Sequence, residues 1–138
     1  MEIIEKTVEA KIDNLQEVLN LVEEQLELHE ASMKVINIMC ISVEEIFANV
    51  CMYAYSESQT IGNCTISIWF ENDDVIIKIV DDGFEFNPLA KEDPDIHASV
   101  EDRGVGGLGI YMVKQYMDSC TYDRIDNQNI FTMRRTIK

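Results

Sequence analysis

Apolar residues recur along this chain with spacings that predict both strands and helices. Residues 3–8 alternate loosely between apolar and polar positions, which indicates a short β-strand. Leucine and valine then recur every three or four residues between positions 15 and 26, and glutamates occupy the opposite face. That spacing predicts an amphipathic helix whose apolar side packs on a core.

The segment 33–55 is apolar on nearly every side, as is typical of a buried helix. Its polar residues Ser42, Glu45, Asn49 and Tyr53 are spaced three and four apart and therefore form one stripe. Burying a carboxylate and an amide in an apolar helix is costly unless other groups satisfy them. A hydrated metal ion or a bound ligand would do so, and so would an internal hydrogen-bond network or a partly solvated edge.

Two pairs of β-rich segments follow, each arranged around a polar turn. They predict hairpins over residues 65–80 and 121–135, and a helical pattern lies between them. The order is therefore strand, helix, helix, hairpin, loop, helix, hairpin. This order predicts an α+β fold, a two-layer sandwich with helices on one face of a mixed, mainly antiparallel sheet.

Glycines mark the connection between the two hairpins. An acidic turn, DDGFEFNP, occupies residues 81–88, and its first aspartate stands where a strand enters a loop. Residues 104–109, GVGGLG, lead directly into a helical pattern. Glycines ahead of a helix let the backbone approach a ligand closely, and the free N–H groups of the first turn favour an anion. A nucleotide phosphate is the obvious anion, although a plain loop has the same composition.

Length and charge narrow the class of protein. With 138 residues, we expect one domain over 1–138. The net charge of −15 argues against nucleic acid and against anionic membrane surfaces as partners. Because there is no long uncharged apolar run and no signal-peptide pattern, we expect a soluble cytoplasmic protein. Acidic side chains concentrate before residue 103, so the glycine run lies at the start of the basic part of the chain.

The four cysteines show no C-x-x-C spacing, and we expect free thiols rather than disulfides or a zinc site. His29 and His97 are too far apart in sequence, and too poorly accompanied, to indicate a metal site.

Taken together, the polar stripe and the two glycine segments resemble a known superfamily. Glu45 with Asn49, Asp81 with Gly83, and residues 107–109 resemble the N, G1 and G2 boxes of the GHKL ATPases, which have the Bergerat fold. The short length and the pattern GGLGIYMVKQYMD are similar to the anti-sigma-factor serine/threonine kinases of bacteria, the switch-protein-kinase branch. The resemblance covers roughly residues 33–135, and three motifs in the right order make it specific.

The resemblance implies an ATP site with Mg²⁺ and gives the motif residues roles. Asn49 would be a ligand of Mg²⁺, which prefers oxygen, and Glu45 would be the general base for the attacking hydroxyl. Asp81 would accept a hydrogen bond from the adenine amino group; a turn-capping aspartate is the alternative. For Thr132, near the adenine by resemblance, the alternative is an ordinary strand residue. The residues expected to contact the nucleotide are Asn49, Asp81, Gly83, Phe86, Arg103, Gly106, Gly107, Leu108, Gly109 and Thr132.

Two departures from the family pattern affect this interpretation. Glu85 stands where many members have a second glycine, although the continuation through Phe86 resembles the anti-sigma subgroup. Val105 stands where the kinases commonly carry an arginine, and Arg103 lies two residues further upstream. Arg103 would take the phosphate contact through a shifted loop, so the mismatch bears more on transferase activity than on ATP binding.

Three functions are compatible with the resemblance. The first is a serine/threonine kinase that phosphorylates a STAS-type anti-anti-sigma protein and sequesters a sigma factor. The second is a non-catalytic, nucleotide-dependent binding module with the same partners. The third is a detached ATPase domain of a sensor kinase or another GHKL machine. In the family, an early helix such as 15–26 takes part in dimerisation or partner contact, so a homodimer stays open.

The segment 89–103 lies where GHKL proteins keep a lid over the nucleotide. It is acidic, and Pro94 prevents a continuous helix through it. We expect this segment to be mobile without nucleotide and to bring Lys91 or Arg103 toward the γ-phosphate on closing. A solvated acidic loop that never moves is the alternative.

Overall fold

The helices and strands follow the order that the sequence predicts. The computed structural model describes residues 2–55, 62–90 and 107–138. Three short segments, η1 (Ile12–Asn14), the π-helical η2 (Val50–Ala54) and η3 (Pro88–Ala90), connect the longer elements. These are β1 (Ile4–Glu9), α1 (Leu15–Leu28), α2 (Met33–Asn49), β2 (Asn63–Glu71), β3 (Asp74–Asp81), α3 (Gly107–Tyr116), β4 (Ser119–Ile125) and β5 (Gln128–Thr136).

The five strands form one sheet in the order β1-β2-β3-β5-β4. Every pairing between the described strands is antiparallel, where the sequence predicted a mixed sheet with mainly antiparallel pairs. Both predicted hairpins are present. Their turns place Asn72, Asp126 and Asn127 at φ values of 54°, 52° and 64°. Asparagine and aspartate adopt this left-handed conformation more readily than most residues, which is why these sequences turn tightly.

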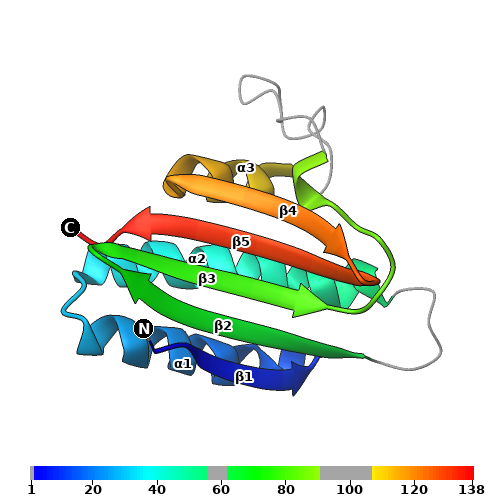
Figure 1. The fold of residues 1–138 in the computed structure, drawn as a ribbon, viewed down its shortest axis with the longest axis horizontal. Coiled ribbons are helices and arrows are strands. Elements are labelled where there is room, and N and C mark those ends of the chain that lie inside the picture. Colours follow the sequence, from blue (N-terminus) through cyan, green and yellow to red (C-terminus); the bar gives the residue numbers. More distant parts are fainter. Residues whose placement is uncertain (1, 56–61, 91–106) are drawn as a thin grey trace.

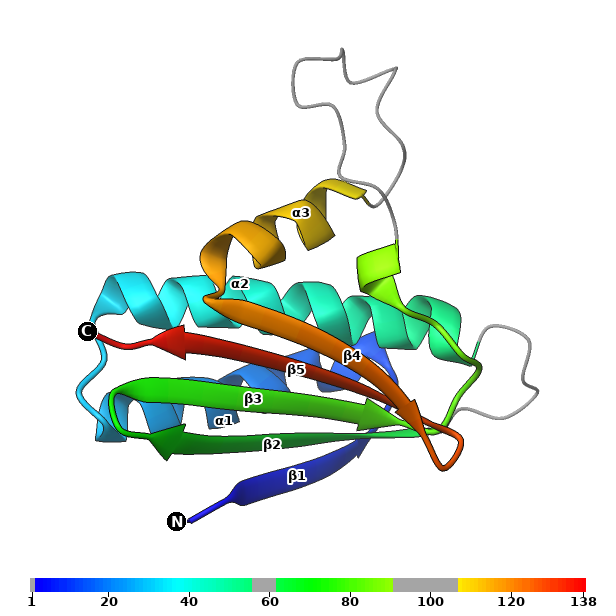
Figure 2. The same cartoon turned by 45° about the horizontal axis from the view of Figure 1, so that its top comes forward.

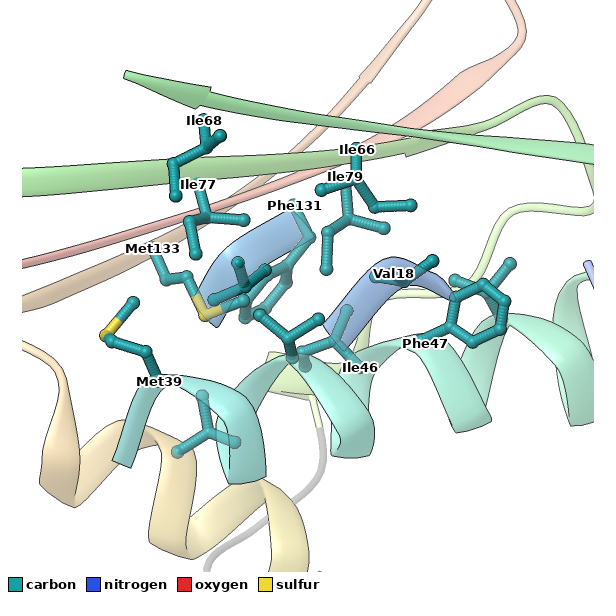
Figure 3. Packing of buried hydrophobic residues seen from close by; sticks show 14 of the residues in the cluster. Val18, Met39, Ile46, Phe47, Ile66, Ile68, Ile77, Ile79, Phe131 and Met133 are labelled. Carbon is teal, nitrogen blue, oxygen red and sulfur yellow. The ribbon is translucent and has the colours of Figure 1, made fainter. Parts of the chain in front are cut away.

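The helices cover one face of the sheet, as the two-layer prediction requires. Figures 1 and 2 show α1 and α2 side by side behind the strands, with α3 beside α2 near β4. Alternate strand residues point toward the helices, as Figure 3 shows for Ile66, Ile77 and Phe131. They meet the fully buried side chains of α2, among them Met39 and Phe47. The α+β fold class is therefore confirmed.

The central helix α2 is the apolar segment that the sequence singled out. Met39, Val43 and Phe47 are 0% exposed, because the sheet lies on one side of α2 and both other helices contact it. The stretch Met33–Ala54 is also the one helix, within the described residues, that is long and apolar enough to span a membrane, with a mean hydropathy of 1.6. A helix that forms the core of a sandwich has the same composition.

The first turn of α2 begins with a side-chain cap, which gives a test of how firmly this helix is fixed. Ser32 Oγ accepts a hydrogen bond from Val35 N at 3.2 Å. We expect Ser32→Ala to lower the free energy of unfolding by about 1 kcal/mol, because one N–H group of the first turn loses its partner. Denaturant unfolding measures this value, with Ser32→Asp as the matched control that keeps a capping oxygen. An equal loss in both variants would contradict a capping role.

All four cysteines are free thiols, with Cys64 buried and the others partly buried. Burial raises the pKa of Cys40, Cys51 and Cys120 to about 11, which keeps these thiols protonated and weakly reactive at neutral pH.

Candidate functional site

Three segments that are distant in sequence meet at one end of the sheet. They are the end of α2 with η2, the loop 81–88 after β3, and the hairpin of β4 and β5 (Figures 1 and 2). They line a small pocket with a cavity volume of about 20 Å³, and the open space around it brings the empty volume to about 310 Å³. Its walls are mainly apolar with a few polar groups: Ile46, Asn49, Val50, Ala54, Ile79, Asp81, Phe86, Pro88, Tyr122, Asn129 and Phe131.

Asp81 supplies the buried carboxyl group of this pocket. Its side chain ends β3 and is 5% exposed. Oδ1 accepts two hydrogen bonds of 2.9 Å, from Gly83 N and from Nδ2 of Asn129. Burial raises the pKa of this carboxyl group, and the bonds from Asn129 and Gly83 oppose that rise. Among the described residues these donors both bind Oδ1, which leaves Oδ2 as the acceptor for a ligand.

Gly83 is the point at which the loop 81–88 touches η2, the segment that follows α2. Phe84 N donates a hydrogen bond to Ala54 O at 2.7 Å, and a Cβ atom at Gly83 would overlap the same carbonyl. Ala54 belongs to the π-helical segment η2, a conformation that is rare and frequently found at functional sites. The glycine is therefore required by the packing of the protein's own backbone, before any ligand is considered.

Asn49 and Phe86 line the same pocket from two sides. Asn49 is the last residue of α2 and is partly buried. Phe86 comes from the loop after β3 and stacks on Tyr53 of η2, with ring centroids 5.1 Å apart. An aromatic ring beside an apolar pocket suits a flat heteroaromatic ligand.

Glu45 lies one helical turn before Asn49 and faces the start of α3. A Cβ atom at Gly109 would overlap Oε2 of Glu45, so the glycine makes room for the carboxylate. The first turn of a helix carries free N–H groups and a positive partial charge. The predicted general base and the predicted phosphate-binding glycine are thus in contact, although 64 positions separate them in the sequence.

Comparison with known proteins agrees with this arrangement. The model of the histidine kinase-like ATPase domain matches residues 8–135. The chain belongs to the histidine kinase-like ATPase family. Its fold is similar to the crystal structure of the RsbU and RsbW domains of Rv1364c from Mycobacterium tuberculosis, with a TM-score of 0.70 and 14% identity. The likeness covers 99% of this chain and 33% of the other, so this chain spans about a third of its structural relative. No curated protein matches the chain.

In this histidine kinase-like ATPase, Thr132 does not lie at the pocket, and its expected place near the adenine needs correction. Asp81 pairs with Asn129 across the two strands, and Lys78 pairs with Thr132. Because successive strand residues face opposite sides of a sheet, Asn129 points to the helices with Asp81, whereas Thr132 points to the other face. Asn129 is the site residue that sequence reasoning missed. Its signal was its register opposite Asp81, which only strand pairing reveals.

The remaining predicted residues divide into two groups. Ser42, the buried member of the polar stripe, donates a hydrogen bond to Ile38 O at 2.8 Å. For this residue the internal hydrogen bond, and not a ligand, satisfies the polar group. Gly107 and Leu108 begin α3. Arg103 and Gly106, together with the lid residues 91–103, lie outside the described part of the chain.

Proposed function

We propose that this histidine kinase-like ATPase is an anti-sigma regulatory factor with serine/threonine kinase activity. Its substrate would be a STAS-type anti-anti-sigma protein, and it would sequester a sigma factor or an analogous regulator. The observation that carries the proposal is the contact between Glu45 and Gly109. It puts a carboxylate at the start of α3, one turn along α2 from the pocket of Asn49 and Asp81.

The residues that line the pocket suit the adenine end of ATP, which the family implies as ligand. Its walls are apolar enough to bury a base, and Phe86 offers an aromatic face. Asp81 presents an acceptor where adenine carries an amino group, which is a donor. The glycines at the start of α3 would offer N–H groups to the phosphates.

Mg²⁺ also fits the residues present. The side-chain oxygen of Asn49 is a suitable ligand, and the described ranges 2–55, 62–90 and 107–138 hold no group of three histidine, cysteine or acidic side chains that could bind a metal ion. Mg²⁺ usually has few protein ligands and takes the rest from waters and substrate phosphates. When bound, it would neutralise phosphate charge in a chain whose net charge is −15.

The chain's residues would divide the work of phosphoryl transfer. A new bond forms between the substrate hydroxyl oxygen and the γ-phosphorus of ATP, and the bond from that phosphorus to the β,γ-bridging oxygen breaks, leaving ADP. Glu45 accepts the hydroxyl proton as the oxygen attacks. Asp81 and Phe86 hold the base, and Asn49 and α3 hold the phosphate end, so positioning supplies much of the catalysis.

The partners follow from the same proposal. The structural relative is named for its RsbU and RsbW domains, and this chain shares its fold. We propose a cytoplasmic protein, with a homodimer as a further possible state, and neither nucleic acid nor membrane as a direct partner. A non-catalytic, nucleotide-dependent binding module is the second candidate function. It is favoured by Val105, which stands where the kinases commonly carry an arginine.

Two measurements test the proposed function in order. Calorimetry with ATP and Mg²⁺ should detect binding, and its absence would end the proposal at its base. Incubation with labelled ATP and the STAS-domain protein encoded nearest to it should then transfer label to a serine or threonine of that protein. Binding without transfer to this partner would favour the non-catalytic module.

A further inference from the structure

Asn129 uses its whole side-chain amide to hold the loop after β3 in place. Its side chain is 5% exposed at the start of β5. The two Nδ2 hydrogens go to Asp81 Oδ1 at 2.9 Å and to Phe84 O at 2.7 Å. Oδ1 accepts from Phe86 N at 3.2 Å and from the Tyr122 hydroxyl. All four positions of the amide are therefore occupied by groups that line or support the pocket.

These contacts decide which atom Asp81 can offer to a base. Asn129 and Gly83 both donate to Oδ1, so they fix the plane of the carboxylate and leave Oδ2 as the oxygen for a ligand. Burial raises the pKa of this carboxyl group, and both donors oppose that rise by favouring the ionised form, in which Asp81 is an acceptor only. An acceptor pairs with the 6-amino group of adenine and repels the 6-oxo group of guanine or hypoxanthine.

We propose that Asn129 is a positioning residue that sets the choice of base, by keeping Asp81 a fixed acceptor that selects a 6-amino purine. The proposal rests on the proposed function, because it assumes that the pocket binds a purine nucleotide. Without Asn129, the carboxylate keeps a single donor, Gly83 N, and is free to turn. It can then bind a proton more readily and donate a hydrogen bond to a 6-oxo group.

Other charged and titratable groups surround Asp81 but do not replace Asn129. Asp82 follows it in the chain and raises the pKa of the Asp81 carboxyl group, and Arg124 on β4 lowers it. Arg124 donates to Gly83 O at 2.8 Å, so it braces the loop rather than binding the carboxylate. Cys64 pairs with Asp81 across β2 and β3 as a protonated thiol. Among the described residues, Asn129 is the side chain that donates a hydrogen bond directly to Asp81.

The test compares three nucleotides that differ at position 6 of the purine, and ITP also carries a hydrogen at N1. ATP carries an amino group there, ITP an oxo group, and purine riboside triphosphate a hydrogen. Calorimetry with Mg²⁺ gives the ratio of ATP affinity to each of the other two. We expect Asn129→Ala to lower both ratios about tenfold, since one charge-assisted hydrogen bond is at stake, and to leave purine riboside triphosphate nearly unchanged. A loss of fold alone would weaken all three ligands alike.

The controls separate the role of Asn129 from the proposed function, which is nucleotide binding itself. Thr132→Ala, on the opposite face of the same strand, should keep the wild-type ratios. If Asn129→Ala does not fold, Tyr122→Phe removes only the hydroxyl that donates to Asn129 and should lower the ratios in the same direction. Unchanged ratios in a folded Asn129→Ala, or in Tyr122→Phe as its substitute, would overturn the role of Asn129. If the wild type binds none of the three nucleotides, the proposed function fails as well.

Discussion

Replacing Glu45 by glutamine is expected to reduce phosphoryl transfer by about a hundredfold or more while ATP affinity stays within about twofold. Glutamine has the shape of glutamate, so it fits the space that Gly109 leaves at the start of α3. It lacks the basic oxygen that takes the hydroxyl proton. The loss is therefore confined to the chemical step, because the pocket that holds the base does not include Glu45.

Transfer is measured with labelled ATP and the STAS-domain partner, and binding is measured by calorimetry on the same preparation. Glu44→Gln is the matched control, because Glu44 is the neighbouring residue of α2 and is exposed. It removes the same charge and should transfer phosphate like the wild type. If Glu45→Gln also transfers like the wild type, the polar stripe of α2 is structural and the chain's general base lies elsewhere.

Asp81→Asn is the second large effect we expect, and it acts in opposite directions on binding and on stability. The asparagine oxygen can keep the bonds from Gly83 and Asn129, which leaves its amide nitrogen where Oδ2 was. A donor then faces the amino group of adenine, itself a donor. We expect ATP affinity to fall by about a hundredfold, because a buried donor is left unpaired on each side.

Stability should rise, and the pH dependence gives the reason. Burial raises the pKa of Asp81 above its ordinary value of 3.8, so the folded state binds this proton more tightly than the unfolded chain. The contribution of Asp81 to stability is therefore fully present below the ordinary pKa and is lost as pH rises through the higher pKa of the folded state. Asparagine has no charge to bury and removes this part of the pH dependence.

Thermal unfolding between pH 4 and pH 8 should show Asp81→Asn at least as stable as the wild type at neutral pH, with the difference shrinking toward acid. Asp82→Asn is the matched control, since Asp82 is exposed and adjacent. It should retain ATP binding and show no comparable gain. A strong loss of stability in Asp81→Asn would mean that the ionised carboxylate supports the fold, contrary to the direction of its pKa shift.

Much of this fold could be predicted because its signals are local. The all-round apolar helix, the amphipathic helix before it and the two hairpins each follow from residues within one short window. The turn at Asp126 and Asn127 is a case in which two residues alone determine a tight connection. The motif residues Asn49, Asp81 and Phe86 line one pocket. The sequence could predict this because the family resemblance relates their segments to one site.

The parts that could not be predicted depend on pairing between distant segments. A shift of one residue in a strand moves a side chain to the other face of a sheet, so a threonine and an asparagine three positions apart exchange roles. Nothing in the sequence near Thr132 shows whether Thr132 or Asn129 lies beside Asp81. The register of β3 and β5 decides this. Likewise, the π-helical segment η2 leaves no periodic signal, because a single turn is too short to shift the apolar pattern.

The glycine at position 109 separates two properties that mutation usually damages together. Alanine forms a helix more readily than glycine, by about 1 kcal/mol, and among the described residues the three atoms nearest to its added methyl group belong to the flexible end of Glu45. A single methyl group there would leave the fold sound and displace the carboxylate from α3. A lineage could thus abandon catalysis in one step while keeping its binding surfaces intact. Among genome sequences, glycine or alanine at this position would then distinguish active enzymes from descendants retained purely as binding proteins.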